Sequence, residues 1–302
     1  MEKKRLKKLN ENQTHRISFA KFLFKEAEKK CRLPNPNDSI TILNLHDSVD
    51  IYIQLLAEFY NCKPDNKTSL MSTVNSINTK LVELKLEKLE LSLFDRLNTA
   101  RNKLKHETIF LNQIDIFGFI SGVKNFYIES TPLYFGGLKF ESISLVNLVK
   151  SPKVKKCLQY AKKEIENKKY NPALEKINEA FGYIINDITT FKSNQGYRVS
   201  VKPSKWFHPI SSSYIGNFDK HGIKGFNDFE RGLKESFDYL NELIIINNFK
   251  VNINDYARFK QYKLYGYMST TTKFTVVGEY KNKIKENEIN FCFDFVLQIA
   301  LS

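Results

Sequence analysis

Glycine and proline are scarce in this chain, with 12 glycines and 8 prolines among 302 residues. These two residues supply most of the tight turns on which sandwiches, barrels and propellers depend. Their scarcity leaves long segments uninterrupted, and apolar residues recur in many of those segments at steps of three or four. The sequence therefore predicts a mainly α-helical protein, and its 42% hydrophobic content is enough to build buried cores.

The apolar periodicity places a series of amphipathic helices along the chain. The expected helices cover residues 1–30, 42–59, 70–90, 91–104, 114–126, 152–161, 171–185, 229–247 and 289–301, with a short connecting helix over 143–148. An extended segment is expected over 271–280, and loops over 32–38 and 193–226. The pair over 152–161 and 171–185 resembles a helical hairpin.

A domain boundary is expected where a proline and a glycine pair interrupt the helical pattern, at Pro132 and Gly136-Gly137. A chain of 302 residues is long enough for two ordinary domains of roughly 100–200 residues each. We therefore expect one helical domain over residues 1–135 and a second over residues 136–302.

The chain is strongly basic, with 47 Lys and Arg residues against 33 Asp and Glu and a net charge of +14. Such a charge suits a polyanion such as RNA, because basic side chains that neutralise phosphates release condensed counterions. AT-rich coding drift is the alternative explanation, since lysine greatly outnumbers arginine.

The sequence shows no sign of a membrane, a metal site or a cofactor. Its apolar runs are far shorter than a membrane span, and its basic N-terminus leads into no apolar signal core, so we expect a cytoplasmic protein. The four cysteines form no Cys-x-x-Cys pair, so they are expected to be free thiols, and no metal or cofactor is expected. The cysteines are at residues 31, 62, 157 and 292.

One short string carries groups that suit catalysis: Ala-Arg-Asn-Lys-Leu-Lys-His over residues 100–106, at the end of an expected helix. Asn102 and His106 are four apart and share a helix face, whereas Arg101 lies about 100° from Asn102 around the axis. These three groups converge only if the helix end distorts or if a partner surface lies against them.

The three groups match what cleavage of an RNA phosphodiester requires. A neutral imidazole accepts the 2′-hydroxyl proton, a guanidinium holds the phosphate at two points, and an amide orients either group. Lys103 and Lys105 are expected to add contacts to RNA. The alternative is a solvated helix end whose terminal His106 complements the helix dipole.

This region resembles the HEPN superfamily of helical domains, whose nuclease members carry Arg-x(4–6)-His, often with Asn, Asp or His after the Arg. The resemblance covers about residues 40–130: two helices, the motif on a later helix, and another helix after it. It implies a metal-independent endoribonuclease in which Arg101, Asn102 and His106 occupy the motif positions, and whose site forms where two HEPN domains face each other. It further implies a toxin–antitoxin, abortive-infection or phage-defence role, with an antitoxin or defence partner protein. The whole chain also resembles a poorly characterised bacterial and archaeal family, on the string over residues 140–146.

The second half contains a partial echo of the motif, because Ala257 and Arg258 align with Ala100 and Arg101. We interpret residues 136–302 as a degenerate HEPN-like copy, in which Arg258 supplies a phosphate contact opposite Arg101. The two halves then form a pseudo-dimer within one chain, whereas a homodimer of first domains is the more usual arrangement in the family. Coincidence between two short lysine-rich helices is the alternative.

Two functions follow from these observations. The first is a metal-independent endoribonuclease with His106 as acid and base, Arg101 as phosphate clamp and Asn102 as orienting group. The second is a catalytically silent helical scaffold that binds RNA or a partner protein.

Overall fold

The computed structural model describes most of the chain. The described residues are 8–34, 36–62, 69–194, 251–268, 274–277 and 283–302, together with residues 243, 246, 247 and 249. Residues 195–226 of the expected loop and most of the expected helix over 229–247 lie outside them. The chain divides into two compact units, unit 1 (Met1–Leu148) and unit 2 (Val149–Ser302), and each is considered by itself.

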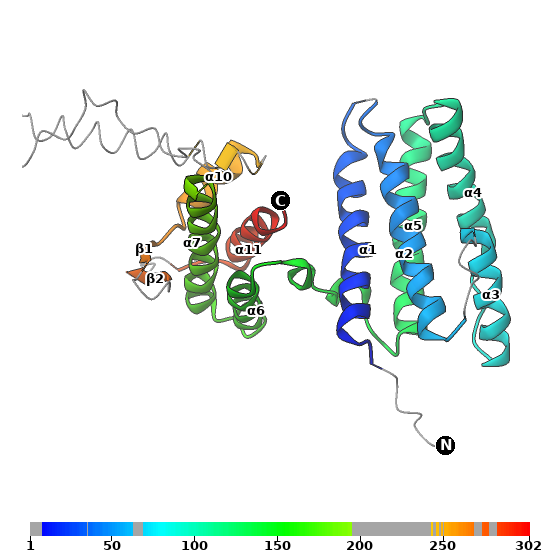
Figure 1. Cartoon of the computed structure of the whole chain (residues 1–302), viewed down its shortest axis with the longest axis horizontal. Coiled ribbons are helices and arrows are strands. Elements are labelled where there is room, and N and C mark those ends of the chain that lie inside the picture. Colours follow the sequence, from blue (N-terminus) through cyan, green and yellow to red (C-terminus); the bar gives the residue numbers. More distant parts are fainter. Residues whose placement is uncertain are drawn as a thin grey trace, which may run out of the picture. The chain divides into compact units, whose positions relative to one another are not determined.

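The described residues form nine α-helices and one pair of strands (Figure 1). Unit 1 holds α1 (Glu11–Lys30), α2 (Ile40–Phe59), α3 (Leu70–Glu83), α4 (Leu91–Asn102) and α5 (Gln113–Tyr134), with the π-helical turn η1 (Lys103–Glu107) and the 3₁₀ turns η2 (Phe140–Ser142) and η3 (Leu145–Leu148). Unit 2 holds α6 (Pro152–Glu166), α7 (Tyr170–Asn194), α10 (Ile253–Lys260) and α11 (Glu286–Leu301), with the antiparallel strands β1 (Tyr265–Met268) and β2 (Phe274–Val277). The prediction of a mainly α-helical protein is confirmed.

Helix α2 is the centre of unit 1, because it packs against α1, α3, α4 and α5. Twelve of its 20 residues are buried, since its apolar side chains recur at steps of three and four and so occupy more than one face. Two polar side chains of α2 inside the core are hydrogen-bonded to α5: Ser48 Oγ lies 2.6 Å from the Tyr127 hydroxyl, and Tyr52 shares a 2.8 Å hydrogen bond with Ser130. These bonds fix α5 against α2 through the aromatic core.

The expected break at Pro132 and Gly136-Gly137 is a turn inside unit 1. Pro132 lies within the last turn of α5, and the helix ends two residues later, at Tyr134. Gly136 and Gly137 then adopt positive φ angles of 65° and 83°. The chain then returns to the core, and the ring of Phe140 stacks on Tyr127 with centroids 4.4 Å apart. Unit 1 therefore extends beyond residue 135, to Leu148.

A buried lysine holds this returning segment in place. Lys21 of α1 is 8% exposed, and its ammonium donates to the carbonyl oxygens of Phe140 at 3.1 Å, Glu141 at 2.7 Å and Ile143 at 2.7 Å. Segment 140–143 thus depends on α1 for its backbone hydrogen bonds as well as on Tyr127 for packing.

Unit 2 begins with the expected helical hairpin. Helix α6 is joined to α7 through Lys168, which takes a positive φ of 58°, and the two helices pack along each other and against α11. The strand pair aligns Tyr265 with Val277, so part of the expected extended segment over 271–280 is a strand. No helix among the described residues has both the length and the apolar character to cross a membrane.

All four cysteines are free thiols, as the sequence predicts. Cys31, Cys157 and Cys292 are buried and Cys62 is half-buried. Desolvation on burial raises the pKa of Cys157 and of Cys292 to about 12, so at neutral pH both remain uncharged and poorly nucleophilic.

Candidate functional site

Helix α4 places the first two motif residues at the border of the unit 1 core. Phe94, Leu97 and Ala100 are spaced by three and are all buried, so one face of α4 lies against α2. Arg101 and Asn102 follow directly and are half-buried. Their backbones are therefore fixed by core packing, while part of each side chain remains open to solvent.

The helix does not continue regularly through the motif. After Asn102 it widens into the π turn η1, which contains Lys103, Lys105 and His106, all exposed. The turn closes where the N–H groups of Thr108 and Ile109 both donate to the carbonyl oxygen of Lys103. A π turn spans one more residue than an α-helical turn, and such turns are frequent at functional sites.

The widened turn alters the relation between Arg101 and His106. In a regular α-helix residues five apart lie about 140° from each other around the axis. The additional residue in η1 reduces this angle, because a π turn hydrogen-bonds residues that are five apart. The distortion that the motif requires for Arg101 and His106 to approach each other is thus present.

The guanidinium of Arg101 has an unsatisfied hydrogen-bond donor and, among the described residues, no ion-pair partner. Its Nη1 donates to Oδ1 of Asn102 at 2.9 Å, while its buried Nε has no hydrogen-bond partner. Within the described part of the chain no carboxylate lies within ion-pair distance of Arg101. A guanidinium in this condition favours an anion such as a phosphate, because an anion supplies both the missing acceptor and the missing charge.

The π turn ends on a strained residue. Thr108 adopts the left-handed conformation with φ 55°, which is unfavourable for a β-branched side chain. A glycine at this position relieves the strain, so Thr108→Gly is expected to raise the free energy of unfolding by about 1 kcal/mol. Denaturant unfolding measures the change. The matched control is Thr99→Gly, at an exposed position inside α4, which should instead lose about 0.5 kcal/mol. An equal loss in both variants would contradict the assignment of strain to Thr108.

Exposed apolar side chains follow the motif. Ile109 and Phe110 are each nearly half exposed, and Ile114, in the first turn of α5, is 82% exposed. We call these three residues the apolar patch. Ile116, Phe119 and Val123 form the buried face of α5, and Ile114 lies about 200° from Ile116 around the helix axis. The helical spacing itself would have identified Ile114 as exposed.

Arg258, the predicted RNA contact of the second half, lies on α10 of unit 2. Its guanidinium packs over the ring of Phe291 on α11, 3.9 Å from the ring centroid. The order of elements along the chain differs between the two units. In unit 2 the strand pair lies between α10 and α11 in the sequence, whereas in unit 1 only residues 108–112 lie between η1 and α5. The phosphate contact of Arg258 and the degenerate-copy interpretation remain predictions.

The described residues include no group of three or more His, Cys, Asp or Glu side chains arranged to hold a metal ion. No protein-family model matches the chain, and no match was found among curated proteins or solved structures. The HEPN resemblance therefore depends on the Arg-Asn-x-x-x-His string and on the order of the helices around it.

Proposed function

We propose that this protein is a metal-independent endoribonuclease whose catalytic groups are Arg101, Asn102 and His106. The observation that carries the proposal is the distorted end of α4, where a half-buried arginine without an ion-pair partner among the described residues is followed one wide turn later by an exposed histidine. The exposed Lys103 and Lys105 add positive charge beside them.

In the proposed reaction the 2′-hydroxyl of one nucleotide attacks the adjacent phosphorus, and the bond from phosphorus to the 5′ oxygen of the next nucleotide breaks. A neutral His106 imidazole accepts the 2′-hydroxyl proton, and an imidazolium gives a proton to the leaving 5′ oxygen. Arg101 stabilises the charge that builds on the phosphate oxygens, and Asn102 holds the guanidinium. The products carry a 2′,3′-cyclic phosphate and a 5′-hydroxyl.

Two copies of unit 1, paired across the apolar patch, would supply the two histidines that this reaction uses in opposite protonation states. The patch lies directly after the motif, so a two-fold contact there brings two motifs near each other. Burial of Ile109, Phe110 and Ile114 favours such a pair. The proposed partners are thus RNA and a second copy of the chain.

The proposed setting is the cytoplasm, as part of a toxin or defence system in which an antitoxin or another partner protein restrains the activity. This part of the proposal comes from the family resemblance. A nuclease that cuts cellular RNA needs such restraint, so a stable partner is expected when the protein is expressed from its native locus.

The test is cleavage of a mixed-sequence single-stranded RNA by the purified full chain in the presence of EDTA. Wild type is expected to cleave under these conditions and to leave 2′,3′-cyclic phosphate ends, which resist phosphatase until acid opens the ring. The new 5′-hydroxyl ends should accept a label from polynucleotide kinase without prior phosphatase treatment. Products with 5′-phosphate ends, or cleavage that EDTA abolishes, would reject the mechanism. Intact RNA with wild type would favour the silent scaffold instead.

A further inference from the structure

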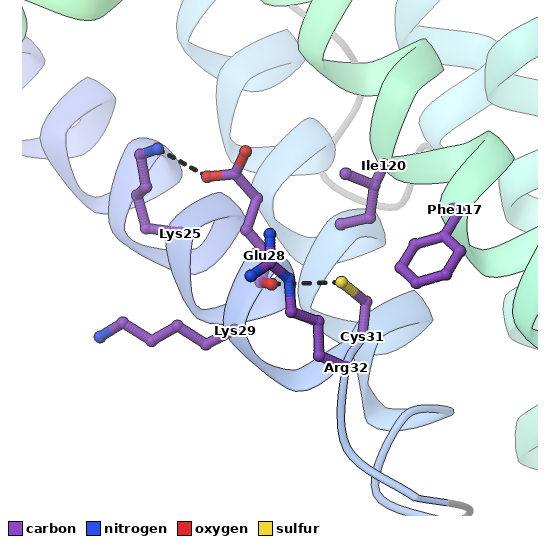
Figure 2. Close-up of a pocket in the computed structure, with 7 residues that line it drawn as sticks. All are labelled: Lys25, Glu28, Lys29, Cys31, Arg32, Phe117 and Ile120. Carbon is purple, nitrogen blue, oxygen red and sulfur yellow. Dashed lines mark hydrogen bonds and ion pairs between the residues drawn. The ribbon is translucent and has the colours of Figure 1, made fainter. Parts of the chain in front are cut away.

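Unit 1 contains a pocket of about 560 Å³ between the end of α1 and the first turns of α5 (Figure 2). It is lined by Lys25, Glu28, Lys29, Cys31, Arg32, Phe117 and Ile120. This volume lies within the range of about 300–1,000 Å³ that is typical of small-ligand sites. A single nucleotide fits a space of this size. We call it the α1–α5 pocket.

The positive charge of the pocket is concentrated on one residue. Lys25 pairs with Glu28 at 2.6 Å and Lys29 pairs with Glu26 at 2.9 Å, so carboxylates of α1 already compensate both lysines. Arg32 is exposed and makes no ion pair with any residue that the structure describes. Its planar guanidinium is suited to bidentate contact with a phosphate.

Charge alone does not specify a ligand here, because basic residues at the end of a helix also complement its dipole. The opposite wall gives the second, independent observation. Figure 2 shows Phe117 and Ile120 of α5 across from Cys31 and Arg32 at the end of α1. The ring of Phe117 is 42% exposed. An open aromatic ring beside a guanidinium is the pair of groups that holds a nucleobase and its phosphate.

The pocket lies at the same end of unit 1 as the motif. Phe117 is one turn into α5, and α5 begins shortly after η1. Figure 1 shows the end of α1, the end of α4 and the start of α5 together at the upper end of unit 1. A strand held near Arg101 and His106 can therefore extend toward the pocket.

We propose that the α1–α5 pocket binds one nucleotide of single-stranded RNA, with its base stacked on Phe117 and its phosphate held by Arg32. This inference rests on the proposed function and identifies the substrate as an unpaired strand. Stacking tolerates any base, so the pocket selects for single-strandedness and not for sequence. A free nucleotide shares the same chemistry, and the test separates the two sources.

The test is the dissociation constant of a fluorescein-labelled mixed-sequence 8-nucleotide RNA, measured by fluorescence anisotropy. The full chain carries His106→Ala, so that cleavage is slow compared with the binding measurement. In that background Phe117→Ala is expected to raise the dissociation constant roughly 10-fold. Phe117→Trp keeps a stacking surface and should stay within about 2-fold of the parent. Arg32→Ala should weaken binding roughly 5-fold and reduce the slope of binding against salt by about 0.7, the loss of one phosphate contact.

Two matched controls lie elsewhere on α1. Phe19→Ala removes an aromatic ring that is 41% exposed and stacks on Phe22. Arg16→Ala removes one positive charge that pairs with Glu58. Both are expected to bind the RNA as the parent does.

Each other outcome is decisive. Binding by Phe117→Ala and Arg32→Ala that equals binding by the controls would overturn the proposal, as would a loss of dimer in Phe117→Ala on gel filtration. AMP that binds as tightly as the RNA, with the same dependence on Phe117 and Arg32, would assign the pocket to a free nucleotide.

The same variants separate the pocket from the proposed nuclease activity. If Phe117→Ala and Arg32→Ala weaken RNA binding while wild type leaves RNA uncut, the pocket is retained and the nuclease is rejected. If wild type cleaves RNA but Phe117→Ala and Arg32→Ala bind it as the controls do, the nuclease is retained and the pocket is rejected.

Discussion

Replacing His106 by alanine is expected to lower the rate of RNA cleavage by a factor of roughly 10² to 10⁴, the usual contribution of a general acid or base. The fold should remain intact, because His106 is exposed in η1 and its side chain makes no hydrogen bond to any residue in the described ranges. Equal thermal unfolding of the variant and wild type, followed by circular dichroism, verifies this. Initial cleavage rates with a labelled RNA give the factor.

The matched control is His15→Ala, which removes another exposed histidine, near the start of α1. It should cleave at the wild-type rate. Loss of activity in His106→Ala purified in the same way as His15→Ala would exclude a contaminating nuclease as the source of activity. Cleavage by His106→Ala at the rate of His15→Ala would show that the motif histidine takes no part in catalysis.

Arg101 provides a graded companion to this experiment. Arg101→Lys retains the charge but loses the two-pronged contact with phosphate, so its rate should fall between those of wild type and Arg101→Ala. Arg101→Ala should lose roughly 10² to 10³ in rate, since it removes a stabilising donor at the phosphate. A lysine variant as active as wild type would mean that charge alone is required.

The helices of unit 1 were predictable because their apolar spacing is regular, but several of their ends were not. The expected helix over 70–90 ends at Glu83, where Lys85 takes a positive φ of 56° and the Leu86 N–H turns back to the Leu81 carbonyl at 2.9 Å. This left-handed turn is of the kind that glycine usually marks. Because lysine takes the place of glycine here, nothing in the sequence indicates that the helix ends at this turn.

The π turn at the candidate site could not be predicted for the same reason: it ends on a left-handed residue that is not glycine. The sequence identifies Arg101, Asn102 and His106 and requires a distorted helix end, yet the position of the π turn depends on Thr108 in a left-handed conformation. Threonine at such a position is uncommon, so no sequence pattern predicts it. The Nε of Arg101 has no hydrogen-bond partner because of how the surrounding side chains pack. The spacing of residues in the sequence does not predict this either.

Unit 1 ends at Leu148 and not at the expected residue 135, because a tertiary contact holds the intervening segment on the core. Pro132 and the glycine pair favour a break, and the chain does turn at Gly136. The contacts of Lys21, more than one hundred residues earlier, then keep segment 140–143 in unit 1. Local composition carries no information about such a partner.

These contacts give a second large expected effect. Lys21→Met keeps an apolar side chain of similar length but removes the ammonium that three backbone carbonyls share. Buried acceptors that lose a charged donor cost about 1–3 kcal/mol each, offset by the desolvation that the buried ammonium no longer suffers. We expect a net loss of about 3 kcal/mol in the free energy of unfolding, measured by urea titration, and a lower melting temperature.

The control is Lys25→Met, one turn further along α1, because the ion pair of Lys25 with Glu28 is solvent-exposed and worth at most about 1 kcal/mol. Hydrogen exchange locates the loss: amides in segment 140–143 should exchange faster in Lys21→Met and remain unchanged in Lys25→Met. If both variants unfold at the same urea concentration, the three carbonyl contacts of Lys21 do not hold the segment. Tyr127, against which Phe140 stacks, would then be the group that keeps the end of unit 1 on its core.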